Sequence, residues 1–250
     1  MNKGLFKLSV RDIVEIALFC AIAVVLDTFV KIPLGVTGGS INIAMVPIFI
    51  IALRHGPVKG FFAGGIVFGL LTAIIDGYGM ATYPFDYLVP FGMAGLLVGL
   101  TSTYVHKNFL KSTLGSIISI IMISVAVALF AATRLFSSAI NSVIIYEYTY
   151  KDGLVYGLTY IPLSALFSGI FLIALLPTII TVSKIKTSYI SSISNTQSGI
   201  KSKVMLLLAA FGICVAAIFI IGMLQPPVYY VFEAVVVLLF LVFDIVVVLR

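Results

Sequence analysis

The chain has 250 residues, of which 62% are hydrophobic and 10% are charged, and its mean hydropathy is +1.24. This composition excludes an ordinary water-soluble globular domain and indicates an integral membrane protein. The formal net charge is +6.

Apolar stretches follow one another along most of the chain, and a helix needs about 20 such residues to cross a bilayer. We therefore expect an all-α integral membrane protein with eight candidate helices, of which the second is the shortest. They cover residues 11–30, 41–54, 57–75, 86–105, 113–133, 154–182, 204–224 and 228–249.

A polar stretch rich in Ser, Thr, Lys and Asn interrupts this series at residues 184–203. It is typical of a linker and is predicted to be cytoplasmic. The sequence therefore predicts a six-helix body at 1–183, the linker, and an additional two-helix transmembrane hairpin at 204–250.

If the N-terminus is cytoplasmic, most basic residues of the loops fall on the cytoplasmic side of the membrane. Twelve of the fifteen basic residues then lie inside, and only Lys31, Arg134 and Lys151 lie outside. This pattern satisfies the positive-inside rule, so the net charge reflects orientation and does not indicate nucleic-acid binding. Residues 1–10 are too short for a cleavable targeting peptide. We expect a multi-pass protein of the cell membrane with a cytoplasmic N-terminus.

Small residues recur four positions apart in several predicted helices. The pairs Ala17 and Ala21, Gly60 and Gly64, Gly65 and Gly69, and Gly95 and Gly99 each share one helical face. Such faces let helix backbones approach closely, and packing within one subunit is the simpler reading for the glycines. The two cysteines, Cys20 and Cys214, lie in separate apolar segments and are expected to be free buried thiols.

Two polar and aromatic segments are predicted to be outer loops. The first, 76–87, reads DGYGMATYPFDY, and the second spans 134–160. Tyrosine rings beside carboxylates suit a flat organic cation. Tyrosines also collect at any membrane interface, and spacing does not separate these two readings.

Motifs of the common enzyme classes are missing. The sequence contains no Walker A, HExxH, CxxC or G-x-S-x-G pattern, so an enzyme, a metal site and a cofactor are not expected. His55 and His106 adjoin Arg54 and Lys107 at predicted helix ends, where we expect interfacial residues.

The last predicted helix contains two acidic residues. Glu233 and Asp244 are eleven residues apart and share a face, which is compatible with proton handling or with plain pairing to another helix.

Several runs in chain order resemble the thiamine-specific substrate-binding (S) components of energy-coupling factor (ECF) vitamin importers. They are VEIALFCAIAVVLDTF at 14–29, GGSINIAMVPIFIIALRHGPVKGFFAGGIVFGLL at 38–71 and FDYLVPFGMAGLLVGL at 85–100. The resemblance covers about 1–183. It implies a six-helix S-component bundle that captures a vitamin from outside. Such a subunit docks on a transmembrane coupling subunit with two ATP-binding subunits, which hydrolyse the ATP.

The resemblance also implies roles for individual residues. Ala17 and Ala21 would dock on the coupling subunit. Asp86 would bind the aminopyrimidine ring, although an Asp is also a good helix N-cap. The other residues implied or predicted to bind the ligand are Tyr87, Tyr78, Tyr83, Arg134, Ser138, Tyr146 and Tyr160.

The chain departs from the family pattern in the second half of the site. Ser138 replaces a family His, Asn141-Ser142 replaces Ser-Gly, Tyr146 replaces an aromatic that is usually Trp, and Tyr160-Ile161 replaces Tyr-Asn. The chain has no Trp at all. Thiamine or a related pyrimidine compound is therefore favoured, with a different vitamin as the alternative.

Two functions of other classes are also compatible with the sequence. Glu233 and Asp244 could couple protons to solute in an autonomous secondary transporter. Asp86 and Arg134 could serve an intramembrane enzyme.

Overall fold

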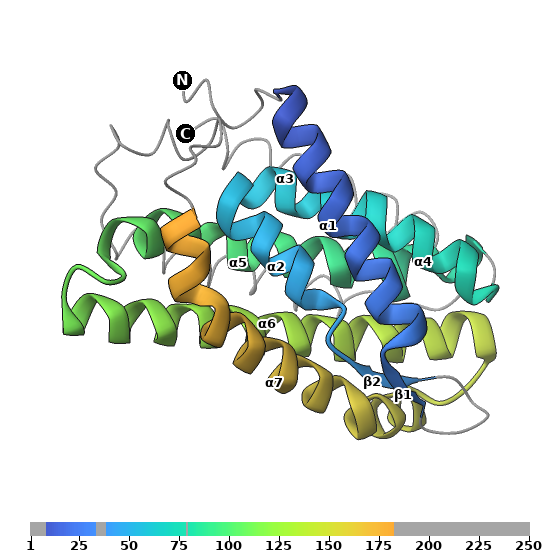
Figure 1. Cartoon of the computed structure of the whole chain (residues 1–250). Coiled ribbons are helices and arrows are strands. Elements are labelled where there is room, and N and C mark those ends of the chain that lie inside the picture. The colour runs from blue at the N-terminus through green and yellow to red at the C-terminus, as the bar shows by residue number, and fades with distance from the viewer. Residues whose placement is uncertain (1–8, 34–38, 79, 183–250) are drawn as a thin grey trace.

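The structure is a computed structural model that describes residues 9–33, 39–78 and 80–182. The predicted linker, the predicted 204–250 hairpin, Cys214, Glu233 and Asp244 lie outside the described residues. Within these residues the chain forms a bundle of six helical segments with one short β-hairpin (Figure 1).

Some of the six helical segments are divided by changes in helix type. In chain order the elements are α1 (Val10–Phe29), β1 (Lys31–Pro33), β2 (Ser40–Asn42), α2 (Met45–His55), α3 (Pro57–Phe61), the π-helical η1 (Phe62–Phe68), α4 (Gly69–Asp76), the short η2 (Met80–Thr82), the π-helical η3 (Tyr83–Leu88), α5 (Val89–Asn108), α6 (Thr113–Tyr146) and α7 (Tyr150–Val182). The two strands pair antiparallel, with Ile32 opposite Ile41.

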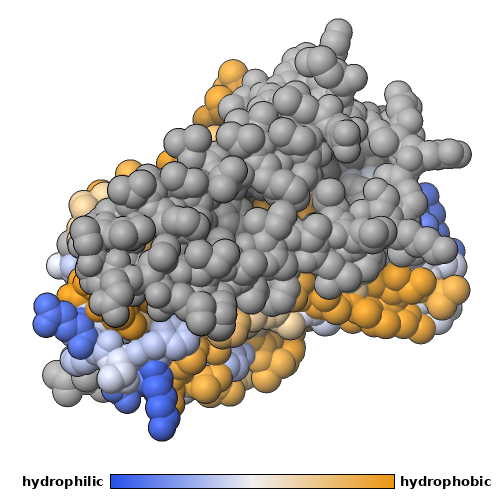
Figure 2. All heavy atoms as spheres, turned by 180° about the vertical axis from the view of Figure 1, so that it is seen from behind, coloured by the Kyte–Doolittle hydropathy of each residue, from blue (hydrophilic) through white to orange (hydrophobic). Residues whose placement is uncertain are grey.

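Four helical runs of the described chain are long and apolar enough to cross a membrane. These are Pro57–Asp76, Met80–Asn108, Thr113–Tyr146 and Tyr150–Val182, while Met45–His55 is a shorter apolar helix. Figure 2 shows apolar side chains exposed over much of the visible part of the described chain, with hydrophilic side chains toward its two ends. The predicted fold class, a multi-pass helical membrane protein, is confirmed for the body.

Local sequence explains where several helices begin and end. Ser9 and Asp12 form a reciprocal capping box at the start of α1, and Ser112 caps α6. Gly56 has a φ of 87°, which a glycine adopts without strain, and it ends α2. Pro57 then starts α3 at a position where its missing N–H costs nothing.

The buried glycines bring two helical runs into backbone contact. A Cβ added at Gly95 would lie 2.0 Å from the carbonyl oxygen of Gly60, and one at Gly64 would lie 2.2 Å from that of Phe91. The packing of α5 against α3 and η1 therefore requires glycine on both sides. The reading of these pairs as packing within the subunit is confirmed, and Cys20 is a buried free thiol as expected.

The predicted loop at 134–160 is wrong, because α6 continues to Tyr146 and α7 begins at Tyr150. Ser137 and Asn141 of α6 are buried inside the bundle, so these polar side chains do not end the helix in lipid. Ser137, for example, is buried and donates to the carbonyl of Phe85 at 2.5 Å. Most of the other predicted loop is helical too, since η2, η3 and α5 run without a break from Met80.

Candidate functional site

A cavity of about 630 Å³ opens at the end of the bundle that carries the β1–β2 hairpin. Helices α1, α4, α5, α6 and α7, the π-helical η3 and the β1–β2 hairpin contribute to its wall. The lining residues are Asp27 of α1; Lys31, Pro33, Gly39, Ser40 and Asn42 of the hairpin; Thr72 and Asp76 of α4; Tyr78; Asp86, Tyr87 and Phe91 of η3 and α5; Arg134, Ser138, Asn141, Ser142 and Tyr146 of α6; and Tyr148, Asp152, Gly153, Tyr156 and Tyr160.

Asp86 lies on the wall between η3 and α6. Its Oδ2 accepts a hydrogen bond of 2.6 Å from Nδ2 of Asn141, and Ser138 is a second side-chain partner. The residue has helix on both sides, in the π-helical turn of Tyr83–Leu88, so the alternative role as a helix N-cap does not apply. π-Helical turns occur frequently at functional sites, because they redirect side chains.

Arg134 is held between two aromatic rings of the wall. Its guanidinium carbon lies 5.1 Å from the ring centre of Phe91 and 5.7 Å from that of Tyr160. Cation–π contacts of this kind stabilise a partly desolvated guanidinium. Arg134 also attracts the carboxylates of Asp27 and Asp86 across the cavity.

Two further carboxylates face the same space. Asp27 accepts a 2.7 Å hydrogen bond from Nδ2 of Asn42, and Asp76 accepts one of 2.9 Å from the hydroxyl of Tyr87. With Asp86 and Asp152, the wall carries four carboxylates against the two basic side chains of Lys31 and Arg134. The cavity therefore favours a ligand with positive charge.

Tyrosine rings enclose the cavity on its α6 and α7 side. Tyr146 and Tyr148 stack with ring centres 6.3 Å apart, and Tyr156 and Tyr160 are 5.5 Å apart. Flat apolar faces beside carboxylates are the surfaces that a flat cation contacts.

The structure brings together seven of the eight residues predicted to bind a ligand: Asp86, Tyr87, Tyr78, Arg134, Ser138, Tyr146 and Tyr160. The eighth, Tyr83, does not line the cavity. Its hydroxyl donates to the carbonyl of Gly65 at 3.0 Å, so it links η3 to η1.

The predicted set omitted several lining residues, above all Asp27, Asn42, Asp76, Asn141 and Tyr156. Asp76 and Asp86 lie in the predicted outer segment 76–87, and Asp27 lies four residues before Lys31, which was predicted outside. Their common position on the outer side was the signal that could have placed the three carboxylates in one site.

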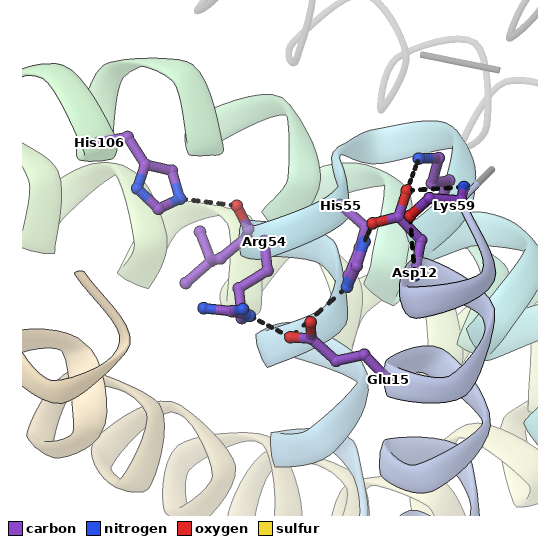
Figure 3. Close-up of polar contacts among 8 residues, drawn as sticks. Asp12, Glu15, Arg54, His55, Lys59 and His106 are labelled. Carbon is purple, nitrogen blue, oxygen red and sulfur yellow. Dashed lines mark hydrogen bonds and ion pairs between the residues drawn. The ribbon is translucent and has the colours of Figure 1, made fainter. Parts of the chain in front are cut away.

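A second polar cluster lies near the start of α1, at the opposite end of that helix from Asp27. Lys59 contacts Asp12 at 3.3 Å, Arg54 pairs with Glu15, and the ring nitrogens of His55 lie 3.7 Å and 3.6 Å from those two carboxylates (Figure 3). The cluster joins α1 to α2 and α3. We call these five residues the α1 ion network.

His55 ends α2, as its predicted place at a helix end requires, but its side chain is 0% exposed. The two acids of α1 sit one helical turn apart and enclose the imidazole, which sequence proximity to Arg54 did not reveal. His106 is partly buried, and its Nε2 lies 2.9 Å from the carbonyl of Leu53.

The outer face of α1 is apolar and exposed. Ala17 and Ala21 are both on it, and the larger exposed side chains nearby include Val14, Leu18 and Ile22. Within the described chain no other element covers this face.

A protein-family model matches most of the chain. The family model described as "Thiamine transporter protein (Thia_YuaJ)" matches residues 13–189. A thiamine transporter ThiT of Bacillus subtilis is 34% identical over 131 residues, which are 49% of this chain and 63% of that protein. A ThiT of Lacticaseibacillus paracasei is 32% identical over 106 residues, 42% of this chain and 51% of that protein.

Other similar proteins carry no functional description. A UPF0397 protein of Clostridium perfringens is 28% identical over 102 residues, 41% of this chain and 53% of that protein. The matched part of the chain thus spans between about half and two thirds of the length of these relatives. The solved structure of ThiT from Listeria monocytogenes superposes with a TM-score of 0.57 at 23% identity, over 68% of this chain and 97% of that one, which supports the fold.

Proposed function

Because the chain belongs to the thiamine transporter protein family (Thia_YuaJ), we propose that it is the substrate-capture subunit of an ATP-driven ECF vitamin importer, binding thiamine or a related pyrimidine compound. Transport across the membrane, without chemical change of the ligand, is the function class that the family and the multi-pass fold support. The observation that carries the choice of ligand is the cavity, where carboxylates outnumber basic groups beside tyrosine rings.

Thiamine has a cationic ring and an aminopyrimidine ring, and both fit the chemistry of this wall. Asp86 accepts hydrogen bonds from the aminopyrimidine, while the tyrosines of α6 and α7 contact the ring faces. Asp27 and Asp76 add negative charge facing the cationic ring. Tyr146, at the family position that usually holds Trp, stacks on a ring of the ligand.

Energy for transport comes from other subunits in this proposal. The sequence has no Walker A motif, so ATP hydrolysis is assigned to two ATP-binding partners and docking to a transmembrane coupling subunit. The exposed apolar face of α1 with Ala17 and Ala21 supports docking, since small residues admit a partner helix closely. Residues 1–183 form the vitamin-binding body, which takes its ligand from outside and releases it to the cytoplasm.

Replacing Asp86 by Ala is expected to weaken thiamine binding more than about tenfold, roughly 1.4 kcal/mol, because a charged acceptor for the ligand is lost. Calorimetry of the purified full chain with thiamine, its phosphates, riboflavin and biotin measures both affinity and ligand choice. Glu147→Gln is the matched control, since Glu147 is an exposed acid at the same end of the bundle that does not line the cavity. Wild-type affinity in Asp86→Ala would remove Asp86 from the site, and preference for another vitamin would reassign the ligand.

Enlarging the small face of α1 is expected to prevent docking. In Ala17→Phe/Ala21→Phe, co-purification of the coupling and ATP-binding subunits should fall at least about tenfold while thiamine affinity is unchanged, because the added rings hold a partner helix away. Leu166→Phe adds bulk at an exposed position of α7 and is the control. Full recovery of the complex, or thiamine uptake by this chain alone in nucleotide-free liposomes, would contradict the proposed coupling.

A further inference from the structure

Asn42 joins the β1–β2 hairpin to α1 and to the start of α2 through its side-chain amide. The residue ends β2, is 6% exposed and lines the cavity. Its Nδ2 donates to Oδ1 of Asp27 at 2.7 Å and to the hydroxyl of Ser40 at 3.3 Å, and its Oδ1 accepts from the backbone N–H of Ala44 at 3.2 Å. A backbone N–H can only donate, so this last bond turns the amino group toward Asp27. The orientation of the amide therefore does not depend on the charge of Asp27.

The carboxylate that Asn42 holds is accessible from the cavity. Asp27 is partly exposed and lines the cavity wall. Within the described part of the chain, Asn42 is the only hydrogen-bond partner of its side chain. A donor at one oxygen favours the ionised form of a carboxyl group. The negative charge still acts on a ligand in the cavity, because attraction between charges requires no particular oxygen.

The charges around Asp27 pull its side chain in different directions. Lys31 and Arg134 attract the carboxylate, and Asp76 repels it. All three line the same cavity. A carboxylate that was free to rotate would turn away from Asp76 toward one of the two basic groups, which would then neutralise it. The hydrogen bond from Asn42 opposes this rotation.

We propose that Asn42 is a positioning residue that holds Asp27 on the cavity wall, where the carboxylate attracts the positive charge of the ligand. This inference rests on the proposed function, in which the ligand is a cation such as thiamine. Asn42 acts through Asp27, since its Nδ2 and Oδ1 already bond protein groups. The pair therefore recognises the cationic ring of the ligand and not its aminopyrimidine.

Ser164 of α7 offers a matched control, because it holds the same strand without contacting the amide. Its hydroxyl accepts from the backbone N–H of Asn42 at 3.3 Å and donates to the carbonyl of Ser40 at 3.2 Å. Loss of this hydroxyl loosens β2 from α7 but leaves the bond between Asn42 and Asp27. If Asn42 only held the hairpin in place, its loss and the loss of Ser164 would have the same effect.

The test is calorimetry of the full chain with thiamine and with its neutral analogue, in which a thiophene ring replaces the thiazolium ring. A pH of 8, above the usual pKa range of aspartate, favours the ionised carboxylate. Wild-type protein should prefer thiamine by at least about 30-fold, and Asp27→Asn should lower this preference about tenfold through loss of the charge attraction. Asn42→Ser should lower it at least about threefold, since one hydrogen bond to the carboxylate is lost. Serine can still accept from the backbone N–H of Ala44 but is too short to reach Asp27.

The control variants separate positioning from the other roles. In the Asp27→Asn background, Asn42→Ser should change the ratio of affinities no further, because the group that Asn42 positions is then uncharged. Ser164→Ala should weaken both ligands alike and keep the ratio. Asn42→Thr makes the same local bond as serine and suits a strand, so it is the second variant if serine lowers the thermal unfolding midpoint of the detergent-solubilised protein.

An unchanged ratio in Asp27→Asn or in the Asn42 variants overturns the inference, while thiamine binding by the wild type still supports the proposed function. An equal fall of the ratio in Ser164→Ala also overturns it, in favour of a role in holding the hairpin. A further fall in the double variant overturns it in favour of direct contact between Asn42 and the ligand. Failure of wild-type protein to bind thiamine overturns the proposed function and the inference with it.

Discussion

Replacement of Lys59 by Met is expected to lower the free energy of unfolding by about 3–5 kcal/mol, because it removes a cationic partner of a buried carboxylate. Asp12 is 1% exposed, and Lys59 contacts it at 3.3 Å. The methionine keeps much of the side-chain volume, so the effect reports mainly on charge. Equilibrium unfolding or thermal unfolding in detergent measures it.

The double variant Asp12→Asn/Lys59→Met removes both charges and should recover a large part of the lost stability. Asn can still accept the hydrogen bond from the backbone N–H of Ser9 that Asp12 accepts in the capping box. Lys111→Met removes an exposed lysine and should change stability by less than about 0.5 kcal/mol. If Lys59→Met and Lys111→Met were equally stable, the α1 ion network would not hold α1 in place.

Gly95→Ala is expected to destabilise the bundle by about 3 kcal/mol, since the new methyl group meets backbone and not a movable side chain. Its Cβ would lie 2.0 Å from the carbonyl oxygen of Gly60, so α3 and α5 would have to separate. Thermal unfolding of the detergent-solubilised protein reports the loss, and the yield of folded monomer reports it independently.

Gly169→Ala is the matched control for this prediction. Its Cβ would come no closer than 3.3 Å to the protein, and there to a methyl group of Val127. Alanine also favours a helix over glycine by up to about 1 kcal/mol, so this variant should be neutral or slightly stabilised. Comparable losses in both glycine variants would mean that helix separation is not the cause.

The sequence predicted secondary structure best in the apolar segments expected to lie in the bilayer. Because backbone groups in a bilayer must be satisfied within a helix, long apolar runs predicted the six helical segments of the body. They missed the last turns of α6 and the start of the run Met80–Asn108. Glycines four apart predicted close packing, and the structure identifies the partners as Gly60 with Gly95 and Gly64 with Phe91.

Polar residues inside helices were the source of error. Arg134, Ser137 and Asn141 suggested a loop, yet all three lie on α6, and their side chains contact other elements of the bundle. Hydropathy reports whether a residue is polar but not whether a cavity or a partner is present to receive it. The pairing of Asp86 with Asn141, 55 positions apart, depends on how η3 packs against α6, and no local sequence pattern indicates it.

Helix α1 carries one acid of the cavity and two acids of the α1 ion network. From Asp12 to Asp27 is 15 residues, or about 22 Å along the axis. The helix contains neither glycine nor proline between Val10 and Phe29, so it has no sequence-encoded hinge. If ligand binding draws Asp27 inward, we therefore expect the helix to tilt as a unit and to carry its exposed face, with Ala17 and Ala21, along with it.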